Sequence, residues 1–150
     1  MVNDEIVSVH YGGKKLDVSG DLASWKAVRS FAFQPSSGLE LRIAVRDVHF
    51  DRADPKHCEK YAGFILHCEA KNTTGNVAPE NPWHKFNSNI NDWRSEGGDQ
   101  LCNDGGEDIW RESPDLQRLL STGASIIWAR GKDSAVLIGS PRSPKVSDIG

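Results

Sequence analysis

The chain has 150 residues, the usual size of a single domain. Its net charge of −3 argues against a dedicated nucleic-acid-binding protein, which would carry a basic excess. Val, Ile, Leu and Phe are frequent enough to form a core, which argues against a disordered chain. No apolar run approaches the roughly 18 residues that cross a bilayer, so we expect no insertion into a membrane.

Alternating apolar and polar residues predict antiparallel strands in the first part of the chain. The clearest strand contains Leu39, Leu41, Ile43 and Val45 on one face, with charged residues on the other. Gly12-Gly13 supplies the positive φ angles of a tight hairpin turn. The predicted strands in this part cover residues 6–11, 14–16, 28–33 and 39–46.

The second part of the chain predicts a central strand, one helix and two late strands. Residues 64–68 form a short continuous apolar run, and residues 125–129 and 135–138 read as the late strands. Between them, Ser113 can cap a helix that Pro114 begins and Gly123 stops. This helix, near residues 114–122, is short and peripheral.

About eight short strands with one short peripheral helix predict an all-β fold, an antiparallel β-sandwich or jelly roll. We expect one domain over residues 1–138, because no linker interrupts it. Residues 139–150 have no apolar period and are predicted to be a flexible tail.

Common catalytic motifs are absent from the sequence, and we expect a protein that is not an enzyme. The remaining enzymatic hypothesis is a small hydrolase or lyase that uses His49 or His84 with a nearby aspartate as general base.

Five tryptophans are the unusual feature of the composition. Open aromatic faces stack on sugar rings, and neighbouring Asn, Asp and Arg groups bind hydroxyls. Trp83 and Trp93 lie in an Asn-rich segment where such stacking is possible, although a place in the core is the alternative for both. Trp128, inside an apolar strand, is expected in the core. The candidate ligand-binding residues are Trp83, His84, Asn91, Asp92, Trp93 and Arg94.

A Gly-rich acidic loop follows these residues. Carboxylate and carbonyl oxygens on such a loop are the ligands that Ca²⁺ takes, although a solvated acidic loop is the alternative. The candidate metal ligands are Asp99, Asn103, Asp104, Glu107 and Asp108.

Three cysteines leave open either three free thiols or one disulfide. If one disulfide forms, we expect it to join Cys68 to Cys102 and to leave Cys58 free. The N-terminus carries no secretory signal, whereas the N-glycosylation acceptor motif Asn72-Thr73-Thr74 favours a secreted, extracellular protein.

Several separated pieces, taken in order, resemble the galactose-binding-domain-like β-sandwich superfamily. The resemblance implies a jelly-roll fold, frequent sugar binding by loops at one end, and often a structural Ca²⁺. The sequence departs from the pattern between residues 49–61 and 71–82, so the ligand does not carry over. The pieces are the hairpin Val9-x-x-Gly12-Gly13-x-x-Leu16, Trp25, residues 28–33, Leu41-x-Ile43-x-Val45-x-Asp47, residues 62–66, Trp93-Arg94, Trp110 and residues 124–129.

We therefore expect a non-enzymatic carbohydrate- or glycoconjugate-binding module, stabilised by Ca²⁺ if the acidic loop binds it. Its partner would be a carbohydrate or a glycosylated protein. The alternative is a protein–protein interaction or structural domain of a larger surface assembly, in which the tryptophans are core or interface anchors.

Overall fold

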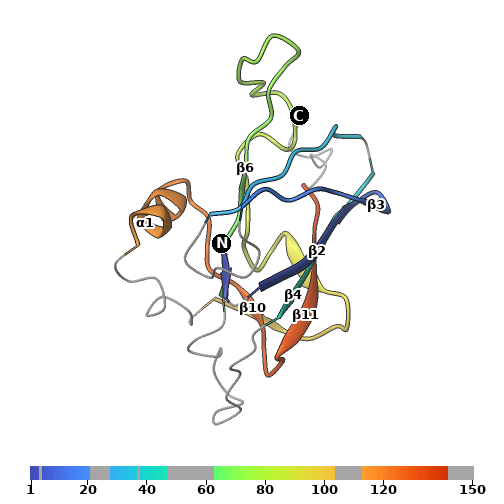
Figure 1. The fold of residues 1–150 in the computed structure, drawn as a ribbon, viewed down its shortest axis with the longest axis vertical. Helices are drawn as coiled ribbons and strands as arrows, with labels where there is room; N and C mark the ends of the chain where they lie inside the picture. Colours follow the sequence, from blue (N-terminus) through green and yellow to red (C-terminus); the bar gives the residue numbers. More distant parts are fainter. Residues whose placement is uncertain (4, 21–27, 37, 47–62, 104–112, 142–150) are drawn as a thin grey trace, which may run out of the picture.

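A five-stranded antiparallel sheet forms one layer of the molecule (Figure 1). The computed structural model describes residues 1–3, 5–20, 28–36, 38–46, 63–103 and 113–141. In spatial order the sheet contains β3 (Lys14–Lys15), β2 (Glu5–Tyr11), β4 (Leu41–Arg46), β11 (Ser134–Gly139) and β8 (Trp93–Ser95).

The alternation of β4 explains the orientation of this sheet. Leu41, Ile43 and Val45 are buried, with at most 1% of each exposed, and they face the core. On the outer face, Arg46 of β4 pairs with Glu5 of the neighbouring β2. Two further ion pairs, Arg42–Glu96 and Arg94–Glu40, reach across β11 between the β4 and β8 segments. These exposed pairs favour the strand order, but each adds little to stability.

Three short antiparallel pairs complete the strands. An isolated bridge between Phe64 and Ile127 adds a further contact between distant segments. Together with the five-stranded sheet they enclose one main apolar core, so the all-β sandwich prediction is confirmed. The pairs are β1 (Val2–Asn3) with β5 (Gly63–Phe64), β6 (His67–Cys68) with β7 (Phe86–Asn87), and β9 (Leu101–Cys102) with β10 (Trp128–Ala129).

The one helix among the described residues, α1 (Pro114–Ser121), lies at the edge of the sandwich (Figure 1). Ser113 Oγ accepts a hydrogen bond from the Leu116 amide at 3.3 Å, and Gly123 follows with a φ of 95°. Leu116 is buried in a second apolar cluster with Met1 and Ile65. The predicted helix is therefore confirmed. No helix in the described ranges is long and apolar enough to cross a membrane.

Some predicted strands differ from those observed. Residues 28–33 are extended but form no strand, since within the described residues their only bridge joins Ser30 to Ser19. The run 64–68 is divided between β5 and β6, and β11 continues through Gly139 into the predicted tail. The described residues contain eleven strands where about eight were predicted, because several are only two residues long. The rest of the predicted tail from residue 142 onward lies outside the described residues.

Ser88 connects three segments of the second layer and is completely buried. Its Oγ accepts from the Leu66 amide at 3.0 Å and donates to the Ser125 carbonyl at 2.6 Å. The Ser88 backbone bonds to the same two residues. Ser88 thus satisfies buried polar groups that two-residue strands leave unpaired.

Replacing Ser88 with alanine is expected to lower the free energy of unfolding by about 2–3 kcal/mol, because it leaves a buried N–H and a buried C=O without partners. Urea unfolding measures this change. Ser134→Ala, at an exposed position of β11, is the control and should change stability by less than about 0.5 kcal/mol. Equal stability of the two variants would show that Ser88 does not connect these segments.

Candidate functional site

The two tryptophans predicted to contact a ligand lie in the core. Trp83 is 5% exposed and Trp93 is 4% exposed. Trp83 packs edge-on against Phe33 and Phe86, with ring centroids 5.0 and 4.9 Å apart. The Trp93 indole N–H donates to the Asn87 carbonyl at 3.2 Å. Both rings therefore take the core alternative, since the sandwich uses their large apolar area, although Trp83 also lines the cleft described below.

The polar residues near Trp93 do not gather around an open aromatic ring. Asn89 Oδ1 accepts from the backbone amides of Asn91 at 2.9 Å and Asp92 at 2.8 Å, which closes a turn. Asn89 also donates to the Asp92 carboxylate at 3.0 Å. The half-buried His84 has a buried Nδ1 for which the described residues supply no hydrogen-bond partner.

Arg94 lies on the outer face of the large sheet. Two hydrogen bonds, of 2.6 and 3.3 Å, join its guanidinium to the Glu40 carboxylate. These bonds lower the pKa of Glu40 and raise the pKa of Arg94. Arg94 thus belongs to the charge pairs of the outer face and lies apart from the buried Trp93 ring.

The predicted Ca²⁺ ligands are described only in part. Asp99 is half-buried, accepts from Ser95 Oγ at 3.3 Å and lies 3.7 Å from Lys132 Nζ. Asn103 is exposed, whereas Asp104, Glu107 and Asp108 lie outside the described residues. Among the residues with assigned positions, no three His, Cys, Asp or Glu side chains form a metal-binding group.

The cysteines differ from the predicted pairing. Cys68 is a free cysteine, and Cys102 is disulfide-bonded. The predicted Cys68–Cys102 bond is therefore wrong. Cys68 faces the interior between the layers, whereas Cys102 lies in β9 beside Trp128. The third cysteine, Cys58, which was predicted to be free, lies outside the described residues.

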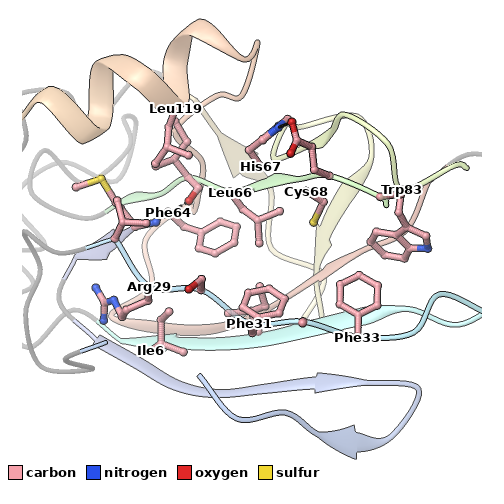
Figure 2. A pocket seen from close by; sticks show the side chains of 18 of the residues that line it. Ile6, Arg29, Phe31, Phe33, Phe64, Leu66, His67, Cys68, Trp83 and Leu119 are labelled. Carbon is pink, nitrogen blue, oxygen red and sulfur yellow. Dashed lines mark hydrogen bonds and ion pairs between the residues drawn. The ribbon is translucent and has the colours of Figure 1, made fainter. Parts of the chain in front are cut away.

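A cleft of about 450 Å³ lies between residues 28–35 and residues 65–71 (Figure 2). Ile6 and Ile43 from the large sheet contribute to its lining, and Leu119 contributes from the helix. Leu66 and Cys68 point into this space from the 65–71 side. The cleft is therefore mostly apolar and lies between the two layers of the sandwich.

Aromatic rings form the opposite wall. Phe31 and Phe33 are half-buried and stack at 6.3 Å with an interplanar angle of 23°. Phe33 also contacts Tyr11 at 4.3 Å and meets the edge of Trp83. The segment 28–35 therefore presents a fixed aromatic surface although it is not a strand.

Cys68 and His67 are neighbours that lie on opposite sides of their strand (Figure 2). Burial raises the pKa of the Cys68 thiol to about 12, so it remains protonated at neutral pH. A nucleophilic cysteine needs the thiolate and an adjacent base. This arrangement provides neither.

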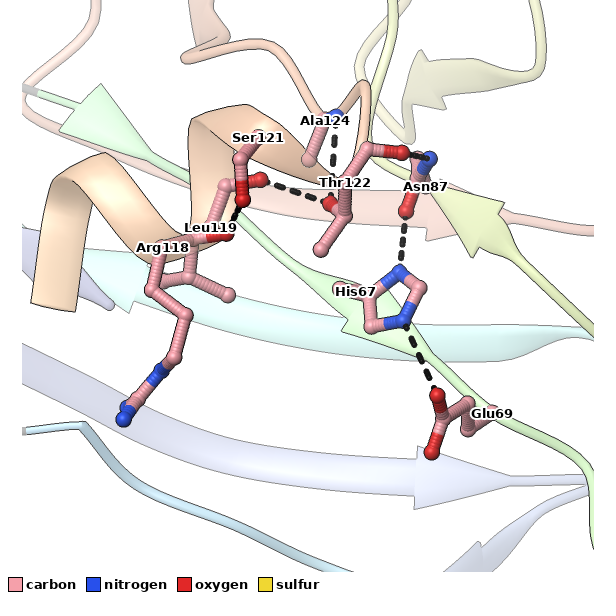
Figure 3. Close-up of polar contacts among 8 residues, drawn as sticks. All are labelled: His67, Glu69, Asn87, Arg118, Leu119, Ser121, Thr122 and Ala124. Atoms are coloured by element: carbon pink, nitrogen blue, oxygen red, sulfur yellow. Dashed lines mark hydrogen bonds and ion pairs between the residues drawn. The ribbon is translucent and has the colours of Figure 1, made fainter.

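His67 instead belongs to a polar cluster that connects β6 and β7 to the end of the helix (Figure 3). Asn87 donates through Nδ2 to the Thr122 carbonyl at 3.0 Å, so its Oδ1 accepts from His67 Nδ1 at 2.6 Å. His67 Nε2 lies 4.0 Å from Glu69 Oε1. Because Thr122 is the C-cap of α1, this cluster fixes the helix beside the cleft.

Phe31, Phe33 and Leu66 were not among the predicted site residues, and Cys68 was predicted only as a disulfide partner. The alternation of residues 28–33 places Phe31 and Phe33 on one face, whereas Leu66 and Cys68 come from the continuous apolar run 64–68. A visible signal was the pair of large aromatic residues Phe31 and Phe33, which lie two positions apart and so share one face of an extended segment.

No family model matches the chain, and no curated protein or solved structure is significantly similar to it.

Proposed function

We propose that the protein is a non-enzymatic binding module that takes a small ligand in the cleft between residues 28–35 and 65–71. The observation that carries the proposal is the cleft itself. Its volume of about 450 Å³ falls in the range of roughly 300–1,000 Å³ that is usual for small-molecule sites.

The lining favours a ligand with an apolar face. Phe31 and Phe33 offer half-buried rings on one wall, and Leu66 and the protonated Cys68 thiol offer apolar surface on the other. Gln34 and Lys71, which also line the cleft, are exposed, whereas the lining residue Arg29 is buried and donates to the Val2 carbonyl. A ligand with an apolar body and polar groups toward solvent therefore fits this chemistry best.

A carbohydrate or glycoconjugate is the first ligand class to test. A pyranose has an apolar face that can stack on an aromatic ring, and its hydroxyls can turn toward the polar residues. Phe31 and Phe33 would then take the role that the sequence predicted for Trp93, beside Trp83, which also lines the cleft. A purely apolar ring compound is the competing ligand, since much of the lining lacks hydrogen-bonding groups.

Binding should depend on the cleft and not on the outer face of the sheet. We expect the anionic dye anilinonaphthalene sulfonate to bind the native protein. The substitution Cys68→Leu fills part of the cleft and should weaken dye binding about tenfold, or about 1.4 kcal/mol. Phe31→Ala should weaken it through loss of the aromatic wall. Fluorescence titration measures both changes, and a glycan array with and without Ca²⁺ tests the carbohydrate class.

Val7→Leu is the matched control, because Val7 is 55% exposed on β2 and does not line the cleft. Circular dichroism of each variant establishes that it is folded. The proposal is wrong if the native protein binds neither the dye nor any arrayed glycan. It is equally wrong if Cys68→Leu and Val7→Leu bind as tightly as the parent chain.

A further inference from the structure

The turn at residues 71–77 is an exposed feature that, apart from Lys71 at its base, does not line the proposed ligand site. It is part of the green loop that projects from one end of the molecule in Figure 1. All seven of its residues are exposed, and its base is closed by a bridge between Lys71 and Val77. The turn contains Asn72-Thr73-Thr74, the only Asn-x-Ser/Thr triplet in the chain.

We propose that Asn72 is the acceptor of an N-linked glycan. A glycan is bulky and hydrophilic, so its attachment site must stay at the surface after folding. Asn72 meets this condition. The glycan would extend from the projecting turn into solvent without displacing any part of the core.

The side chains of the triplet bond to one another. Asn72 Oδ1 accepts from the Thr74 amide at 3.0 Å and from Thr74 Oγ1 at 2.6 Å. Gly75 takes a φ of 85° and allows the chain to reverse. In the described residues, Asn72 Nδ2 makes no hydrogen bond, so the nitrogen that would carry the sugar is uncommitted.

The disulfide is an independent observation that agrees with this site. Cys102 is disulfide-bonded, and stable disulfides form in the oxidising compartments through which secreted chains pass. N-glycosylation of this triplet takes place on the same route. The bonded Cys102 and the exposed acceptor turn therefore imply the same compartment.

The modification is a glycosyl transfer from a lipid-linked oligosaccharide pyrophosphate. Asn72 Nδ2 forms a bond to C1 of the first sugar while the bond from C1 to the pyrophosphate oxygen breaks. The pyrophosphate leaves with the electron pair, and the amide nitrogen loses one proton to a base of the transferase. No oxidation or reduction takes place.

The test expresses the full chain behind a cleavable secretion signal in mammalian cells. Mass spectrometry should find one glycan that peptide:N-glycosidase F removes, with conversion of Asn72 to aspartate. Occupancy is measured on all chain that enters the secretory lumen, whether or not it is later secreted. Asn72→Gln and Thr74→Ala should lower occupancy at least tenfold.

Three variants separate the acceptor motif from the turn. Thr74→Ser keeps the hydroxyl, and Thr73→Ala changes the middle position, which the motif leaves free, so both should stay glycosylated. Asn76→Gln alters an asparagine of the same turn outside the motif and should also stay glycosylated. An unmodified Asn72 in lumenal chain with its Cys102 disulfide formed, or a glycan that persists in Thr74→Ala, would overturn the proposal.

Discussion

Replacing Trp93 with alanine is expected to lower the free energy of unfolding by about 4 kcal/mol, within the range of about 3–5 kcal/mol for truncating a buried large aromatic residue. The ring is 4% exposed and packs against Phe64 and Phe86, with centroids 5.3 and 5.8 Å away. It also covers Gly139, where an added Cβ would lie 2.5 Å from the indole. Urea unfolding followed by circular dichroism measures the loss.

This result distinguishes a core residue from a ligand contact. Ile90→Ala is the control, because Ile90 lies in the turn that precedes β8 and is 42% exposed. It should change stability by less than about 0.5 kcal/mol. A Trp93→Ala variant as stable as the parent chain, but without affinity for a glycan bound by the parent, would restore the sequence-based hypothesis of an open stacking ring.

The elements that local sequence determines were predictable. The Gly12-Gly13 turn and the alternation of residues 41–45 gave the β2–β3 hairpin and β4 in their observed places. Ser113, Pro114 and Gly123 gave the ends of α1. Turn glycines, caps and period-two alternation act over a few residues, so they can be read without knowing the rest of the fold.

The candidate site could not be predicted in this way because its walls come from distant segments. Phe31 and Leu66 are far apart in the sequence. The local pattern of residues 28–33 does not determine whether this segment pairs into a sheet. The Trp93 ring is covered because β8 pairs with β11, the last strand, in a register that places Trp93 opposite Gly139. An aromatic ring between polar neighbours therefore looks the same in sequence whether it is open or covered.

The cysteine pairing failed for a related reason. Cys68 and Cys102 each lie beside apolar residues, and the sequence does not say which face of its strand each occupies. In the fold, Cys68 turns toward Phe31 and Phe33 in the cleft (Figure 2). Pairing depends on where the Cβ atoms come together, a property of the packed layers and not of spacing along the chain.

The contribution of the Met1 amine to the free energy of unfolding is expected to fall by about 4 kcal/mol as the pH decreases from about 8.5 to about 4.5. The Met1 amine is buried and donates to the Ile65 carbonyl at 2.8 Å. Burial, with a smaller contribution from the Arg29 charge, lowers the pKa of this amine from 8.0 to about 5.

The sign follows from proton binding in the two states. The pKa of the amine is lower in the folded chain than in the unfolded chain, so between pH 8 and pH 5 only the unfolded chain takes up the proton. Protonation therefore favours unfolding by about 1.4 kcal/mol for each pH unit in this window. Above the window neither state is protonated and below it both are, so the contribution of Met1 becomes constant on either side.

A single isotope label isolates this amine from the other titratable groups of the chain. Met1 is the only methionine of the chain, so ¹³C-methionine labelling gives one Cα signal, with retention of Met1 established by mass. In the folded protein this signal should titrate with a midpoint near 5, and in urea with a midpoint near 8. A folded-state midpoint near 8 would mean that the amine is solvated. The anchoring of β1 against residues 63–65 would then rest on strand pairing alone, and the pH dependence of stability would have to come from other groups.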